Sequence, residues 1–492
     1  MANNEHQHFS GGEMGLRVAI LVLFSAIPAL CMRARAPAEK VDEGTVFEDV
    51  LIEDVPHVRQ KSDFCGEACA EMYLRKLGSD IDQDYVFNKS GVDPLEARGC
   101  FTAELAEALR KIGFKVGNVW YKVGADEADE QIGKHFEALH ADMVEGIPSI
   151  VCMHYDDGAA AAEHFRLVLG YDSKKDEVVY HEPAEAEGAY RRMKREKFLQ
   201  FWPLKYDKKQ WTLIRIRLKA GEINKPEPVS GFTNADYAQH MIKLRKIIPD
   251  DSFTVVLQRP FVVIGDESPA VVRWRSVRTI KWAVDMLKQD YFQKDPDDII
   301  DIWLFKDEKS YKKRAWEIFG DRPDTPFGYY SHEHTALIMN IGTGGGTLVH
   351  EIVHPFVNSN FPECPAWFNE GLASLYEQCR EKDGRISGLT NWRLAGLQKD
   401  IRAGKMRSFR ALTHTSEKEF YKQDDWDKYA QARYLCYYLQ EKGLLVKFYH
   451  EFYANRENDP TGFESLKKVL GKKDMDAFQK KWEKFVLKLT FP

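Results

Sequence analysis

Residues 347–377, TLVHEIVHPFVNSNFPECPAWFNEGLASLYE, constrain the fold more than any other stretch. His350 and His354 are four residues apart, so on a helix both imidazoles project from one face with the carboxylate of Glu351 beside them. Imidazole nitrogens suit Zn²⁺, and a catalytic zinc site needs a third protein ligand. Glu370 is the candidate, because the apolar residues around it predict a second helix that buries one face. The spacing therefore predicts a zinc site.

The same stretch resembles the gluzincin metallopeptidases, in which HExxH supplies two metal ligands and a general base and a later glutamate supplies the third ligand. It is most similar to bacterial gluzincin-like domains with a Pro-x-Trp-x-x-Glu-Gly-Leu-Ala segment, which residues 365–373 reproduce. The resemblance implies peptide-bond hydrolysis in which Glu351 takes a proton from a water activated by zinc. A chance HExxH with solvated side chains is the alternative.

Two departures from that family change the expected geometry. Thermolysin-like sequences have an aspartate four residues after the third ligand, where this chain has Ser374, so the groups that orient the histidines must come from elsewhere. Pro355 directly follows His354 and lacks an N–H, so we expect the helix to kink or end there.

A tyrosine is the candidate for stabilising the oxyanion. Tyr429 resembles a position at which related domains place a tyrosine near the metal, and a phenol there would donate to the oxyanion. Tyr329 and His332 are rivals, and packing is the alternative role. Strands are predicted at 253–266 and at 336–341; we consider the second as a sheet edge to which an extended peptide could add.

Length and composition limit the number of domains and the kinds of function that we expect for the whole chain. A length of 492 residues favours two or three domains, and 44% hydrophobic residues support packed cores. The net charge of −6 comes from 70 basic and 76 acidic residues that are interspersed, which argues against a nucleic-acid surface. The eight cysteines are scattered and do not define a redox compartment.

Residues 1–45 are predicted to be a signal peptide or N-terminal anchor. The uncharged run at 18–32 is short for a membrane span and suits the apolar part of a signal peptide, with a small-x-small cleavage site at 34–36. We therefore expect export to the periplasm or the extracellular space. A start that is never cleaved and tethers the chain to a membrane is the alternative.

Residues 46–220 carry a second set of reactive side chains. Cys65 begins a predicted helix, where the helix dipole should lower its pKa and favour the nucleophilic thiolate. Gln60 could supply an amide to an oxyanion hole. His164 opens one predicted strand and Glu182 ends the next, so the chain offers a base and a group to orient it.

This order resembles the papain-like cysteine peptidases of the bacteriocin leader-processing (double-glycine) type. The resemblance implies that Cys65 attacks, His164 exchanges the proton, Glu182 orients His164 and Gln60 stabilises the oxyanion. Glu182 departs from the Asp or Asn usual before that proline, and its reach is one methylene longer. His181 beside it is interpreted as a strand residue. A family member that binds peptides without cleaving them is the alternative.

The sequence thus predicts an α+β protein: a papain-like domain at 46–220, a Pro- and Gly-containing linker at 221–236, and a mostly helical zincin-like domain with a small mixed sheet at 237–492. The predicted function is that of a peptidase with Zn²⁺ as cofactor and a peptide or protein as substrate. The alternative is a non-catalytic peptide-binding or scaffold protein in which one or both sites are vestigial.

Overall fold

A computed structural model describes residues 47–158, 162–228, 230–422 and 426–491. The predicted signal segment lies outside these residues. Residues 47–492 form one compact unit of α+β class. No helix in the described ranges is both long enough and apolar enough to cross a membrane. Below, residues 47–220 are called the cysteine region and residues 237–491 the HExxH region.

The cysteine region is built on a seven-stranded antiparallel sheet. Its central order is β2-β7-β3-β4-β5-β6, and β1 pairs with β4. The strands are β1 (Val50–Leu51), β2 (Trp120–Gly124), β3 (Ser149–His154), β4 (Glu163–Asp172), β5 (Glu177–His181), β6 (Arg191–Lys194) and β7 (Gln210–Arg217).

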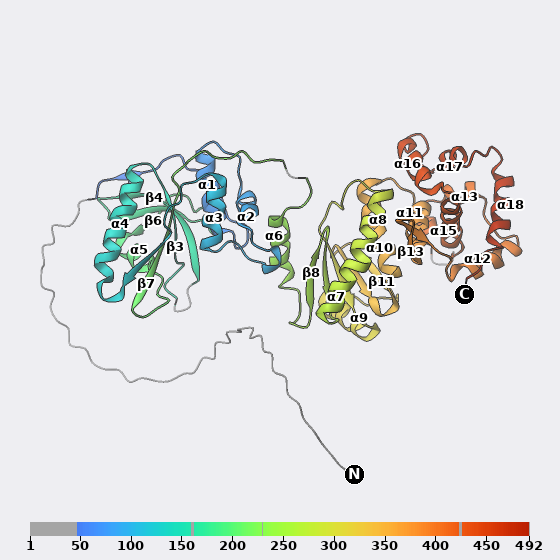
Figure 1. Cartoon of the computed structure of the whole chain (residues 1–492), viewed down its shortest axis with the longest axis horizontal. Coiled ribbons are helices and arrows are strands. Elements are labelled where there is room, and N and C mark those ends of the chain that lie inside the picture. The colour runs from blue at the N-terminus through green and yellow to red at the C-terminus, as the bar shows by residue number, and fades with distance from the viewer. Residues whose placement is uncertain (1–46, 159–161, 229, 423–425, 492) are drawn as a thin grey trace, which may run out of the picture. The chain divides into compact units, whose positions relative to one another are not determined.

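Helices cover both faces of this sheet (Figure 1). They are α1 (Cys65–Lys76), α2 (Gln83–Ser90), η1 (Pro94–Glu96), α3 (Thr102–Ile112), η2 (Ala125–Glu127), α4 (Ala128–Val144) and α5 (Arg195–Phe201). Successive strand residues point to opposite faces. Ile150 and Cys152 of β3 therefore join the core under α1 and α3, whereas Val151 and Met153 join the core under α4.

The predicted linker is partly attached to the cysteine region. The backbone N–H of Asn224 donates to the carbonyl of Ile112, and α6 (Asn234–Leu244) already begins within the predicted linker range, capped by Thr233. Ala235 of α6 packs in the core with α1 to α3, whereas Tyr237 packs against strands of the HExxH region. The domain boundaries stay a prediction.

The HExxH region contains a mixed five-stranded sheet of order β11-β12-β10-β9-β8. Its strands are β8 (Thr254–Gln258), β9 (Phe261–Gly265), β10 (Ile300–Phe305), β11 (Gly328–Ser331) and β12 (Ala336–Asn340). β9, β10 and β12 are parallel, and the two outer strands run antiparallel to them. The prediction that residues 336–341 form an edge is wrong, because β12 lies between β10 and β11. The edge strands are β11 and β8.

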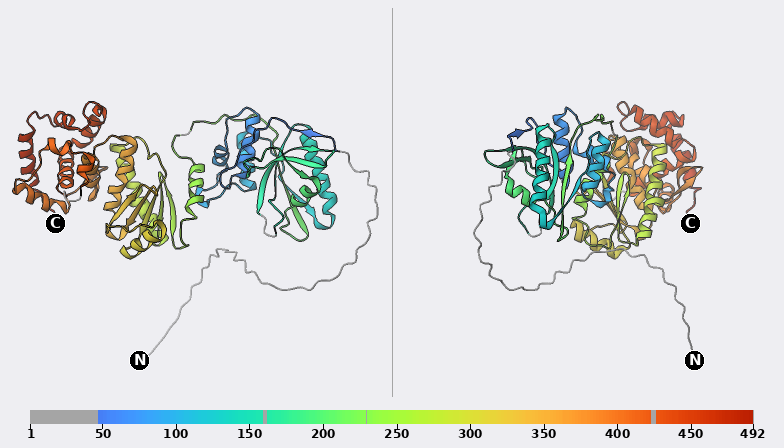
Figure 2. Two further views of the ribbon diagram at one scale, coloured as in Figure 1. Left: turned by 180° about the vertical axis from the view of Figure 1, so that it is seen from behind. Right: turned by 60° about the vertical axis from the view of Figure 1, so that its left-hand side comes forward.

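Two helical layers enclose that sheet (Figure 2). The helices of this part are α7 (Pro269–Arg275), η3 (Ser276–Lys281), α8 (Trp282–Asp290), α9 (Glu308–Arg314), η4 (Ala315–Phe319), η5 (Ile341–Thr343), α10 (Gly346–Asn360) and α11 (Ala366–Leu375). Phe261 and Val263 pack toward α8 and α10, whereas Val262 and Ile264 face the other core with α9. Of the two outcomes expected at Pro355, an end of the helix is wrong, since α10 continues to Asn360; a kink there stays a prediction.

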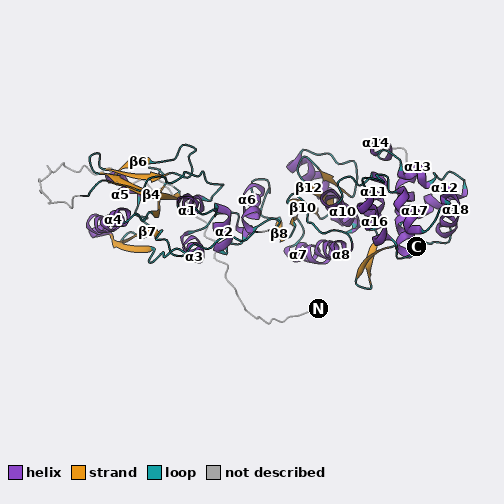
Figure 3. Ribbon diagram, turned by 90° about the horizontal axis from the view of Figure 1, so that it is seen from above, coloured by secondary structure: helices purple, strands orange, loops and turns teal. Residues whose placement is uncertain are grey.

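The C-terminal part is helical apart from one hairpin, β13 (Cys379–Lys382) and β14 (Arg385–Gly388) (Figure 3). The helices are α12 (Arg393–Arg402), α13 (Phe409–Thr413), α14 (Glu417–Phe420), α15 (Trp426–Glu441), α16 (Leu445–Asn455), α17 (Phe463–Leu470) and α18 (Met475–Val486). These helices share one apolar core with α10 and α11. The helices that carry the predicted metal ligands are therefore held on both sides by buried side chains.

Candidate metal centre and cysteine site

The three predicted metal ligands converge. His350 and His354 project from α10 and Glu370 from α11, and one ligand atom of each lies within 4.8 Å of the other two. His350 Nε2 is 3.4 Å from Glu370 Oε2, and His354 Nε2 is 3.9 Å from Glu370 Oε1. Tetrahedral zinc with bonds of about 2.0 Å holds its ligand atoms about 3.3 Å apart. Both the donor types and their spacing fit a zinc ion.

The second nitrogen of each histidine faces a side chain that orients the ring. His354 Nδ1 is 3.0 Å from Asn369 Oδ1, and His350 Nδ1 is 3.3 Å from Glu377 Oε1. Arg393 donates to both oxygens of Glu377, at 2.9 and 3.2 Å. Such outer partners fix the ring orientation of metal-binding histidines. Asn369 and Glu377 were missed by sequence reasoning, although Glu377 lies seven residues, about two helical turns, after the third ligand.

Close helix packing positions the third ligand. A Cβ added at Gly371 would lie 3.1 Å from the backbone oxygen of Ala432, so glycine lets α11 approach α15. Ser374, at the departure from the family pattern, donates to the carbonyl of Glu370 within the helix instead of orienting a histidine. The phenol of Tyr421 donates to Glu370 Oε1 at 3.0 Å. Tyr421 was also missed, because a lone exposed tyrosine gives no periodic signal.

A cavity of about 1040 Å³ opens onto these groups. Its lining includes the predicted general base Glu351, and burial raises the pKa of that carboxyl. The three oxyanion candidates Tyr429, Tyr329 and His332 all line it as well. The Tyr329 phenol already donates to Asp321. Burial raises the pKa of Tyr429, so its phenol keeps the proton that a hydrogen-bond donor needs.

In the cysteine region, the predicted acid reaches the predicted base. His164 Nε2 on β4 is 2.5 Å from Glu182 Oε1, which directly follows β5. The other oxygen of Glu182 accepts from Arg166 Nε at 2.7 Å, and Arg166 is itself buried. Burial opposes ionisation of Glu182, but the hydrogen bond from His164 and the charges of His164 and Arg166 outweigh it and lower the pKa of Glu182. Arg166 was missed, because its partner is sixteen residues away on another strand.

The environment of Cys65 differs from the prediction. Cys65 is the first residue of α1, as expected, but burial raises the pKa of its thiol to about 12 despite hydrogen bonds from backbone N–H groups, including that of Phe165. The predicted lowering of the thiol pKa is therefore wrong. In the described part of the chain, no hydrogen bond joins Cys65 to His164. Because Glu182 occupies Nε2, only Nδ1 of His164 is left to meet a thiol.

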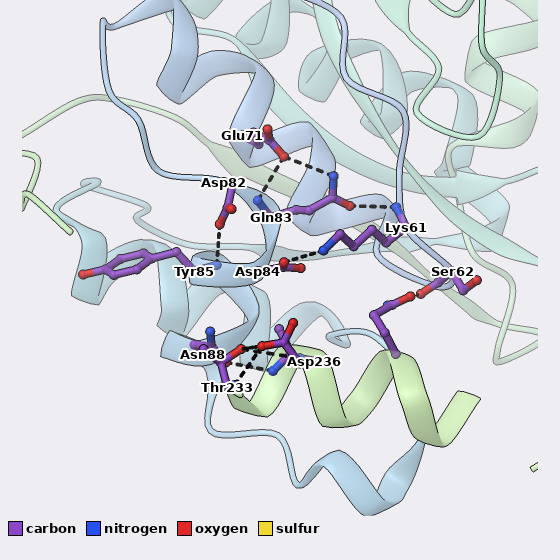
Figure 4. A network of polar contacts seen from close by, with 12 residues as sticks. Lys61, Ser62, Glu71, Asp82, Gln83, Asp84, Tyr85, Asn88, Thr233 and Asp236 are labelled. Carbon is purple, nitrogen blue, oxygen red and sulfur yellow. Dashed lines mark hydrogen bonds and ion pairs between the residues drawn. The ribbon is translucent and has the colours of Figure 1, made fainter. Parts of the chain in front are cut away.

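The loop before Cys65 is fixed by neighbouring helices (Figure 4). The backbone N–H of Lys61 donates to Gln83 Oε1 at 2.7 Å, and the Gln83 N–H donates to the buried Glu71 at 3.0 Å. Gln239 of α6 donates to the carbonyl of Ser62 at 2.8 Å. The loop that carries Gln60 is thereby held from α2 and from α6.

Gln60 itself lies beside the end of the acid-bearing strand. Its backbone N–H donates to the Pro183 carbonyl at 2.9 Å, and its side-chain Oε1 is buried without a hydrogen-bond partner. His181 is a strand residue, as interpreted from the sequence, since its Nε2 lies 2.9 Å from the Val55 carbonyl and its Nδ1 accepts from the Tyr190 N–H. The structure thus brings Gln60, His164 and Glu182 to one end of the sheet.

Comparison with known proteins adds to this geometry for the cysteine region. Residues 52–209 match the Peptidase_C39 like family. This match supports peptidase activity and a cysteine-peptidase type of domain, and it does not extend to the HExxH region. The peptidase domain of Streptococcus ComA, a bi-functional ABC transporter involved in a quorum-sensing pathway, is 17% identical; the similarity covers 33% of this chain and 96% of that domain, with a TM-score of 0.22. No curated protein matches the chain.

Proposed function

We propose that this protein is a zinc-dependent peptidase whose HExxH region hydrolyses peptide bonds. The observation that carries the proposal is the convergence of His350, His354 and Glu370 on the wall of one large cavity, with Glu351 lining the same cavity. Structural histidines and carboxylates normally saturate one another within a core. Here they face an open space of about 1040 Å³, the size expected for a substrate site.

The protein groups have separate tasks in this reaction. A bound zinc ion supplies Lewis-acid chemistry, lowering the pKa of water and polarising a carbonyl. Glu351 accepts a proton from the attacking water and passes it to the leaving amine; its burial favours proton uptake because burial destabilises the carboxylate. Tyr429 donates a hydrogen bond toward the oxygen that gains negative charge.

The edge strand β11 gives the substrate a place to lie. Gly328, Tyr329 and Tyr330 of β11 line the cavity, and one side of this strand pairs with no other strand among those the structure describes. An extended peptide binds such an edge through main-chain hydrogen bonds, which are independent of side-chain sequence. A peptide added at this edge would bring one of its peptide bonds into the cavity that Glu351 lines.

We propose for the cysteine region that it cleaves or binds peptides. The contact between His164 and Glu182 supports the cleaving role. The raised pKa of the half-buried Cys65 thiol and the second ion pair of Glu182 with Arg166 favour the binding role. Enzymatic assays with a thiol-blocking reagent distinguish the two.

Metal content tests the proposal first. Protein purified without added zinc should contain about one zinc per chain, and His354→Ala should lose it because two ligands seldom retain the ion. His414→Ala, which changes a histidine that does not line the cavity, is the matched control. Cleavage of fluorescent casein should then stop with chelator and return with zinc. An absence of metal at neutral pH with zinc supplied would overturn the proposal.

A further inference from the structure

One face of α12 forms a wall of the cavity. Arg393, Gly396, Leu397 and Asp400 line it, and their spacing of three and four residues puts them on one side of the helix. Trp392, which precedes the helix and is 51% exposed, lines the cavity too. A Cβ added at Gly396 would meet no atom within 4 Å. Between the Trp392 ring and the Asp400 carboxylate, the wall therefore has a position, Gly396, without a side chain.

The glycine in this wall has an energetic cost. A glycine inside a helix is less favourable than alanine by about 1 kcal/mol. No neighbouring backbone or side chain explains the glycine at 396, since the space around it is open, in contrast to Gly371, which permits a close helix contact. What the bare position provides is room within the cavity, about 6 Å along the helix axis from Asp400.

The charges that line the cavity are mainly negative. Besides the carboxylates at the metal site, the lining contains Asp324, Asp400 and Glu417, and within the described residues none of these three side chains has an ion pair or a hydrogen bond. Among the described lining residues, Arg393 is the single lysine or arginine, and it is bound to Glu377. A cleft lined by one sign of charge attracts ligands of the opposite sign.

We infer that the cavity selects extended peptides that present an arginine or lysine side chain to α12. The aliphatic stem lies over Gly396 against the Trp392 ring, and the cationic head pairs with Asp400. Long basic side chains combine an apolar stem, which packs on an aromatic ring, with a charged tip, which pairs with a carboxylate. This inference rests on the proposed function, because it names the substrate class of the same cavity.

Binding to a variant that cannot cleave tests the inference directly. The probes are two fluorescein-labelled nonapeptide pools, randomised over uncharged residues at eight positions, with arginine or its neutral analogue citrulline at the centre. Fluorescence anisotropy with Glu351→Gln protein should show about fivefold tighter binding of the arginine pool, the effect of one charge pair. Adding Asp400→Asn should reduce that affinity to the level of the citrulline pool.

Two further variants separate recognition from folding. Asp383→Asn makes the same charge change in the exposed β13–β14 hairpin, away from the cavity lining, and should leave the preference intact. Gly396→Leu should weaken binding of both pools by filling the bare wall, without lowering the unfolding temperature, because its Cβ has free space.

The outcomes also separate this inference from the proposed function. Equal binding of the two pools, binding of neither, or a preference that survives Asp400→Asn would overturn the inference. Zinc-dependent cleavage with no charge preference would leave the proposed function standing alone. Conversely, an arginine preference that depends on Asp400 in a zinc-loaded protein that never cleaves would support the inference and refute the proposed function.

Discussion

The HExxH cavity and the cysteine site use similar residue types in opposite surroundings. At the HExxH site, the ligand atoms of two histidines and a glutamate point at one another across a gap and face a large cavity. At the cysteine site, Glu182 is saturated by His164, Arg166 and the Ala184 N–H, and partial burial raises the pKa of the Cys65 thiol. The comparison teaches that the reactivity of a site depends on which of its side chains still have atoms free to bind a ligand. A sequence motif does not contain that information.

The largest expected effect distinguishes which site cleaves. Glu351→Gln should lower zinc-dependent cleavage of casein about 10³-fold, because the amide cannot accept the proton, while metal content stays unchanged. Cys65→Ser should leave that activity within twofold or so. Initial rates with fluorescent casein measure both. Loss of activity in Cys65→Ser, with activity retained in Glu351→Gln, would assign the cleavage to the cysteine site instead.

The next effect is on stability. Arg166→Met should lower the free energy of unfolding by about 3–5 kcal/mol, because it leaves the buried Glu182 with one fewer charge partner. Arg191→Met removes the exposed pair of Arg191 with Glu185 and should cost about 1 kcal/mol or less. Urea unfolding followed by fluorescence compares the two. A loss no larger at Arg166 than at Arg191 would contradict the view that the acid is saturated by a strong pair.

Thiol reactivity tests the burial of Cys65. A thiol pKa of about 12, against an ordinary pKa of about 8.5, should slow alkylation by iodoacetamide about 100-fold at pH 7, after allowing for the greater nucleophilicity of a more basic thiolate. As long as the pH is below that pKa, each increase of one pH unit should raise the alkylation rate about tenfold, because the thiolate fraction rises tenfold. Mass spectrometry of the Cys65 peptide gives the rate, with a synthetic peptide of residues 60–68, in which Cys65 is the single thiol, as the control. Equal rates at pH 7 would assign a reactive thiolate to Cys65.

The smallest effect concerns the outer partners of the metal ligands. Glu377→Gln keeps the shape of the side chain but removes its charge, so zinc affinity should fall about tenfold. Glu457→Gln, at an exposed glutamate outside the cavity lining, is the control. Competition with a chromogenic chelator measures the affinity. Unchanged zinc binding in Glu377→Gln would show that Asn369 and the helices alone orient the histidines.

The sequence predicted what depends on local pattern and missed what depends on contacts between distant residues. The spacing of His350 and His354 places both on one helix face, which follows from helical geometry alone. The third ligand, Glu370 on α11, was predicted from the need for a third ligand and from the gluzincin resemblance. Sheet order depends on pairing across the chain, which is why β12 was taken for an edge strand. Arg166 and Tyr421 belong to no motif, and their roles appear only when partners far along the chain meet them.

At Pro355 and at Cys65, tertiary packing outweighed the local effect on which the sequence prediction was based. Pro355 removes one hydrogen bond of α10, but its neighbours Ile352, Val353, Phe356 and Val357 are all buried in the core, and that burial holds the helix together past the proline. Cys65 does lie at a helix N-terminus, but burial of its thiol outweighs the favourable backbone groups.

The close contact at Gly371 has an evolutionary consequence. A Cβ at that position would press against the backbone of Ala432, so selection for close packing of α11 on α15 favours the glycine whether or not the neighbouring Glu370 is used. A lineage that no longer used the predicted metal site would still keep this helix contact. Substitutions would therefore appear at Glu351, which lines the cavity, before they appear at Gly371.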